Sequence, residues 1–168
     1  MIIAALIDEL NGAVAHGTVG QRAKIVHRIT ELFAAGAADY SDDQIGLFDD
    51  VLMRVVATIE MSARAALAKR LAKEPRAPIK ISRFLASDDE IDVARPVLEH
   101  SQRLDSDTLM ATARTKSQQH LLAISRRNSL DEALTDVLVE RGDKSVVLST
   151  AGNPGARFSD NGYARLTT

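Results

Sequence analysis

Residues 124–137 read ISRRNSLDEALTDV, and their pattern indicates the fold class. A serine and two arginines precede an acid-capped segment in which Leu130, Leu134, Val137 and Leu138 recur at steps of three and four. This spacing places the apolar side chains on one face of an α-helix. The chain contains no segment with the sustained alternation of polar and apolar residues that is typical of a β-strand. We therefore predict an all-α protein.

The same layout recurs on both sides of this segment, in residues 100–113 (HSQRLDSDTLMATA) and 148–166 (LSTAGNPGARFSDNGYARL). An interval of about 24 to 28 residues is typical of a solenoid, in which stacked helix pairs share one core. We predict a right-handed α-α superhelix with two parts in one continuous domain. Residues 1–75 supply longer helices, and residues 78–168 supply short-helix, HEAT-like repeats.

Capping signals predict where the helices begin. Capping boxes are expected at Thr18, Ser41, Ser87 and Ser129. Simple N-caps are expected at Asp105, Ser117, Asp143 and Ser159. Pro78 is expected to start a short helix, and Pro96 is expected inside the helix that ends near residue 100.

Two boundaries leave a choice. No Gly or Pro interrupts residues 47–74, which favours one long helix over 42–74; the alternative is two helices broken near residues 58–62. Residues 152–155 read GNPG and lack the spacing of a phosphate-binding loop, so we expect a turn between helices. Gly142, Gly152 and Asn153 suit left-handed helix ends.

Composition limits the class of protein. The 168 residues include no cysteine, which excludes disulfides and thiolate metal sites. The 21 basic and 23 acidic residues leave a net charge of −2, which argues against a general nucleic-acid coat. The apolar start MIIAALI is too short for a signal peptide or a membrane span. We expect a cytoplasmic protein without membrane association.

No catalytic constellation stands out. The four histidines lack metal-ligand spacing, although His100 and His120 could meet across neighbouring helices. Three acidic pairs occur, at residues 42–43, 49–50 and 88–89. The first and the third lie in expected first helical turns, where helix capping explains them without catalysis. Ser117, Ser125 and Ser149 lack the context of a catalytic nucleophile. We predict no enzyme, and no catalytic, cofactor-binding or metal-binding residue.

Twelve basic residues form the candidate binding surface, because repeats could align them along one face. They are Arg64, Lys69, Arg70, Lys73, Arg76, Lys80, Arg83, Arg103, Arg114, Lys116, Arg126 and Arg127. One interpretation is a solvated face that acidic turns balance. The others are a surface for an acidic protein or another anion, and, least favoured given the net charge, for nucleic acid.

The first residues of the chain are a second candidate interaction site. Residues 2–10 carry an apolar stripe that we expect to pack onto the next helix; the alternative is a homodimer through residues 1–15. At the other end, Tyr163 and Leu166 are expected to be partly bare or covered by a neighbour, because a solenoid end normally needs a polar cap.

The wording of the sequence also resembles known families. Residues 85–101 (LASDDEIDVARPVLEHS) resemble the first helix of a HEAT repeat. Residues 112–166 (TARTKSQQHLLAISRRNSLDEALTDV and onward), together with GLFDDVL at 46–52, resemble the bacterial family called domain of unknown function 2336, common in alphaproteobacteria. The resemblance implies a HEAT-like helical superhelix across nearly the whole chain and no reaction. It also implies a longer protein, of which this chain would be the N-terminal portion. We expect a non-enzymatic module that binds a protein partner or another part of its own chain.

Overall fold

The structure is a computed structural model that describes residues 2–167, and the side chains of residues 4–167. The described chain is helical and contains no strand, only an isolated bridge between Leu130 and Ala156. The helices are α1 (Ile2–His16), α2 (Val19–Gly36), α3 (Asp42–Val55), α4 (Met61–Leu71), α5 (Ile79–Ala86), α6 (Ile91–His100), α7 (Ser106–Thr115), α8 (Gln118–Ser125), α9 (Glu132–Arg141), α10 (Lys144–Ala151) and α11 (Asp160–Leu166), with a 3₁₀ turn η1 (Val56–Thr58). The prediction of an all-α protein is confirmed.

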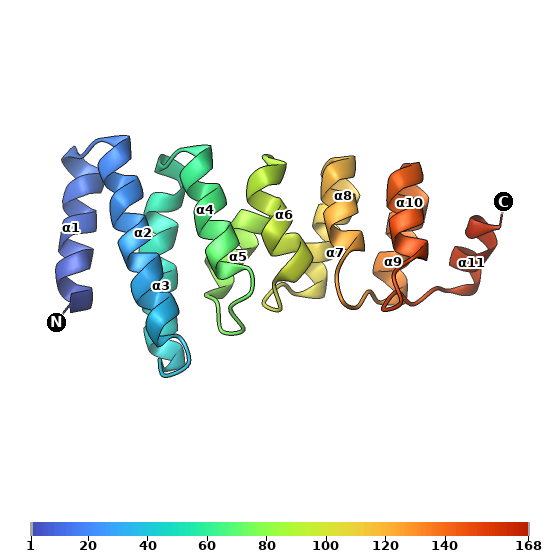
Figure 1. Cartoon of the computed structure of the whole chain (residues 1–168), viewed down its shortest axis with the longest axis horizontal. Coiled ribbons are helices and arrows are strands. Elements are labelled where there is room, and N and C mark those ends of the chain that lie inside the picture. Colours follow the sequence, from blue (N-terminus) through green and yellow to red (C-terminus); the bar gives the residue numbers. More distant parts are fainter. Residues whose placement is uncertain (1, 168) are drawn as a thin grey trace.

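The helices stand side by side in a row of two layers (Figure 1). The first layer holds α2, α4, α6, α8 and α10, and the second layer holds α3, α5, α7, α9 and α11. Each second-layer helix runs up and the next first-layer helix runs back down, so the unit is a helical hairpin (Figure 1). One continuous core runs between the layers, because each hairpin buries its apolar stripe against its neighbours.

The two ends of the row differ. At the N-terminal end, α1 packs on α2 and buries Leu6, Leu10 and Ala13, as the packing interpretation expects. The side chains of Ile2 and Ile3 from the same predicted stripe lie outside the described ones. At the other end Tyr163 of α11 is 59% exposed and Leu166 is half-buried, as expected.

The single long helix predicted over 42–74 is wrong, and the alternative of two helices is correct. The chain leaves α3 through η1, and the extended Glu60 (φ −66°, ψ 158°) precedes α4. The Thr58 hydroxyl donates a 2.7 Å hydrogen bond to the Val55 carbonyl at this break. The reversal leaves Val56 and Ile59 buried in the core, at 1% and 4% exposed. Burial therefore outweighs helix propensity.

Most predicted helix starts are confirmed. Thr18 and Ser41 form complete capping boxes with Gln21 and Gln44. Side chains cap four later helices as expected, and these residues are Asp105, Ser117, Asp143 and Ser159. Pro78 immediately precedes α5, and Pro96 lies inside α6.

The capping boxes at Ser87 and Ser129 are wrong. The Ser87 amide donates to carbonyls in the last turn of α5, so this serine ends a helix, and α6 begins only after Glu90. The cap of α9 is Asp131, whose carboxylate accepts from the Leu134 amide at 2.8 Å. Ser87 belongs to the corner inside the α5–α6 hairpin and Ser129 to the corner between α8 and α9; in both places the helix starts later.

The turn predicted at residues 152–155 is confirmed, but the left-handed helix ends are wrong. No described residue has a positive φ; Gly142 lies at −67° and Gly152 at −82°. Close approach explains Gly142 and Gly155 instead. A Cβ on Gly142 would lie 2.3 Å from the Leu138 carbonyl oxygen, and a Cβ on Gly155 would lie 1.8 Å from that of Asn128.

Candidate binding groove

Three of the twelve candidate basic residues, together with Asn153, tie the corners of successive hairpins to one another. We call Arg76, Arg103, Arg127 and Asn153 the corner ladder; they recur at intervals of 27, 24 and 26 residues. Each lies in the corner after a first-layer helix and donates to backbone carbonyls of the preceding corner. Arg127, for example, donates to the carbonyls of Leu98 and Ser101, both at 2.7 Å.

The other members of the ladder repeat this contact. Arg76 donates to the carbonyls at 37, 38 and 40, and Arg103 donates to that of Ala77 at 2.8 Å. The Asn153 amide donates to the carbonyls at 125 and 127, at 2.9 and 2.7 Å. Burial lowers the pKa of Arg127. These side chains satisfy carbonyls left open at helix ends, so they hold the stack together and are not offered to a ligand.

Six more candidates are held by carboxylates. The pairs are Arg64–Asp88, Arg70–Glu31, Lys80–Asp50, Arg83–Asp105, Lys116–Asp89 and Arg126–Glu99. Their partners come from neighbouring helices or corners and neutralise them where they lie. The hydrogen bond that Lys116 donates holds the pKa of Asp89 below its ordinary value, and the hydrogen bond that Arg70 donates to Glu31 raises the pKa of Arg70.

Three candidates remain without a hydrogen bond or ion pair in the described part of the chain: Lys69, Lys73 and Arg114. Arg114 lies on α7 in the second layer, whereas Lys69 and Lys73 lie on and just after α4 in the first layer. The twelve residues therefore do not share one surface. The structure brings Lys69 and Lys73 together, and it places Arg126 near them through Glu99.

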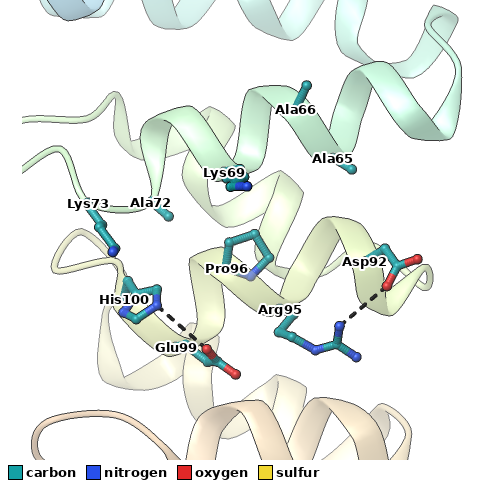
Figure 2. A pocket seen from close by; sticks show the side chains of 10 residues that line it. All are labelled: Ala65, Ala66, Lys69, Ala72, Lys73, Asp92, Arg95, Pro96, Glu99 and His100. Carbon is teal, nitrogen blue, oxygen red and sulfur yellow. Dashed lines mark hydrogen bonds and ion pairs between the residues drawn. The ribbon is translucent and has the colours of Figure 1, made fainter.

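Lys69 and Lys73 line a groove of about 500 Å³ between α4 and α6 (Figure 2). The α4 wall of the groove carries small side chains, namely Ala65 and Ala66 of α4 and Ala72 directly after it. Pro96 faces them from α6, with Arg95 and His100 on the same wall (Figure 2). Sequence analysis selected the lysines but not the alanines, Pro96 or Arg95, because a groove forms only where two helices meet.

The carboxylates of the groove are already engaged. Asp92 accepts from Arg95 at 3.4 Å, and Glu99 lies 3.3 Å from Arg126 and 3.6 Å from His100. The two lysines on the opposite wall have no such counterpart among the described residues. The groove can therefore take up negative charge on its α4 side without breaking an existing pair.

A second polar cluster lies in the corners of α5–α6 and α7–α8. The His120 ring is 1% exposed; its Nδ1 lies 2.7 Å from the Ser117 hydroxyl and its Nε2 lies 2.8 Å from the Asp88 carbonyl oxygen. A carbonyl accepts only, so Nε2 carries the proton and Nδ1 accepts from the serine. Neither His120 nor Ser117 lines the α4/α6 groove. The arrangement fastens two corners together.

His100 and His120, which could have met across neighbouring helices, do not meet. His100 ends α6, while His120 contacts the corner in front of α6, so the two residues lie at opposite ends of that helix. No group of three or more His, Asp or Glu residues suited to a metal ion is found among the described residues. The buried Asp49 accepts from the Lys80 and Ile81 amides at 2.8 Å each, so it caps α5 from α3.

The comparison with protein families concerns the C-terminal part of the chain. Residues 93–168 match the model of a family described as "Uncharacterised protein conserved in bacteria (DUF2336)". This match confirms the family resemblance for α6 through α11; residues 1–92, including the α4 wall of the groove, lie outside it. No curated protein and no solved structure matches the chain. None of the described helices is long and apolar enough to cross a membrane.

Proposed function

We propose that this chain is a non-enzymatic interaction module that binds a protein partner on its first-layer face, with the α4/α6 groove at the centre. One observation carries the proposal: Lys69 and Lys73 line an open groove and have no carboxylate of their own within the described chain. A stack of hairpins presents its outer helices as a long surface, which such proteins commonly use for binding. This last step is an analogy between folds.

The basic residues also bear on the alternative, an anion or nucleic-acid surface. Nine of the twelve candidates are committed to carbonyls or carboxylates, which leaves few charges for a phosphate backbone. Nucleic acids are usually bound through many such contacts. We therefore favour a protein partner.

We also place the module in the bacterial cytoplasm. Fractionation of cells that express a tagged chain would test this location.

A position-specific crosslink tests the proposal. A photoreactive phenylalanine analogue at Ala66, in the groove, should trap one defined protein in cells of the source bacterium. The same analogue at Ala111, exposed on α7 of the second layer, is the matched control. A product at Ala66 that is absent at Ala111 supports the proposal. Equal products at both positions, or none at Ala66, contradict it.

The homodimer through residues 1–15 stays a prediction. Leu6 and Leu10, which would have to form its interface, are 6% and 1% exposed because they pack into the core of the chain. A dimer would therefore have to use the other side of α1. Light scattering of the intact chain tests this directly.

A further inference from the structure

We propose that the α4/α6 groove binds an extended acidic peptide segment in which two carboxylates stand two residues apart. This inference rests on the proposed function, because it names the chemistry of the partner at the same groove. The segment would present its carboxylates to Lys69 and Lys73 and its intervening small residues to Pro96.

Unmatched charge is the first argument. The neighbouring Arg70 turns the other way and pairs with Glu31 at 2.9 Å, and Lys80 pairs with Asp50 at 3.0 Å. Lys69 and Lys73 are exposed, lie one helical turn apart in sequence, and have no such partner in the described chain. Two like charges so placed repel each other, and an anion between them removes this repulsion.

The dimensions of the groove are the second argument. The groove follows α4 from Ala65 to the end of the helix at Leu71, about 9 Å at about 1.5 Å per residue, and continues along Ala72 and Lys73 in the turn that follows. An extended peptide covers that length with about four residues. Side chains two residues apart in an extended peptide lie on one side, separated by about 6.6 Å. Ala72 keeps helical angles (φ −56°, ψ −38°), so the step of four residues from Lys69 to Lys73 rises about 6 Å, which is close to that separation.

The opposite wall argues for a peptide over a nucleic acid. Asp92 and Glu99 stand on α6 and are paired with Arg95 and Arg126, so the α6 wall offers no unpaired arginine to a ligand. A phosphate backbone in the groove would therefore find unpaired cations on the α4 side only, whereas nucleic acids are usually bound through many such contacts. A peptide can place acidic residues on one side and small apolar residues on the other, because its side chains alternate.

Fluorescence anisotropy with a fluorescein-labelled peptide of four Glu-Ala units tests the inference on the full chain. The Lys69→Glu/Lys73→Glu variant should weaken binding at least about ten-fold, because each lysine becomes a repelling carboxylate. The control variant Lys24→Glu/Lys144→Glu changes the net charge equally at exposed lysines of α2 and α10, and should weaken binding by less than about two-fold. A Gln-Ala peptide should not bind.

Several results would overturn the inference: no binding of the Glu-Ala peptide, equal weakening by the two double variants, or tighter binding of duplex DNA through the same lysines. Should the Glu variant lose its helical circular dichroism, the milder Lys69→Gln/Lys73→Gln variant decides, with about a three-fold loss or more expected. The two proposals fail separately. A partner trapped at Ala66 without peptide binding preserves the interaction module and removes the acidic segment. Lysine-dependent peptide binding without any trapped protein preserves the acidic segment as a ligand of the groove and removes the proposed protein partner.

Discussion

Replacement of Asp49 offers a sharp test of how the hairpins are joined. The Asp49 side chain is 5% exposed and accepts hydrogen bonds from two backbone amides at the start of α5, at 2.8 Å each. Pro78, at the N-cap position of α5, offers no side-chain cap. Asp49→Ala leaves both amides unpaired, and a buried unpaired donor costs about 1–3 kcal/mol. We expect a loss of about 2–4 kcal/mol, and about half of it for Asp49→Asn, which keeps one acceptor oxygen.

The neighbouring Asp50→Asn is the matched control. Asp50 makes an exposed ion pair with Lys80, so its loss should have little effect on stability. Urea titrations followed by far-UV circular dichroism compare the variants, and hydrogen exchange at the Ile81 amide reports the cap itself. Exchange of this amide should accelerate in Asp49→Ala and Asp49→Asn but not in Asp50→Asn. If Asp49→Asn and Asp50→Asn unfold at the same urea concentration, the capping role assigned to Asp49 is wrong.

Three further predictions concern single positions. Gly155→Ala should destabilise the fold by about 2 kcal/mol or more, since the added methyl group meets backbone atoms. Gly46→Ala, with open space around it in α3, should stabilise the fold by about 0.5–1 kcal/mol. Thermal unfolding compares the two variants, and a change in stability of the same sign in both would contradict this prediction. Hydrogen bonds from Thr108 and the charge of Arg83 keep the pKa of Asp105 below its ordinary value, so the ionised carboxylate stabilises the folded state at pH values above its unfolded-state pKa. The difference in unfolding free energy between the wild type and Asp105→Asn should therefore shrink as the pH falls below about 4. An unchanged difference in urea titrations at acid pH would refute this prediction. Leu10→Ala should lower the free energy of unfolding by about 3 kcal/mol, and Val14→Ala should lower it by less than about 1 kcal/mol. Neither variant should change the molecular mass found by light scattering. A dimer that Leu10→Ala dissociates would instead favour self-association through residues 1–15.

The helical class could be predicted because apolar stripes and caps are local signals. Leu130 and Leu134 are buried as their spacing predicts, and Thr18 and Ser41 cap helices through side chains three residues away. The break after Val55 could not be predicted, because nothing local forbids a helix there. Only the burial of residues on both sides of the reversal, against helices far along the chain, decides it.

The groove was only partly predictable for the same reason. Clustering in the sequence identifies Lys69 and Lys73, but it also selects Arg70, which a carboxylate 39 residues away neutralises. Arg126 and Arg127 are adjacent arginines that the sequence does not distinguish, yet the Arg127 side chain is turned into the preceding corner. Which cations remain available is a property of the stack, since partners separated by one or more repeats decide it.

The corner ladder gives the molecule a particular response to mechanical load. Each tie spans a single hairpin, so a force that draws the two ends of the row apart is transmitted in series through Arg76, Arg103, Arg127 and Asn153. Such a chain of short links lengthens in discrete steps, with each step releasing one hairpin while the remaining hairpins keep their shape.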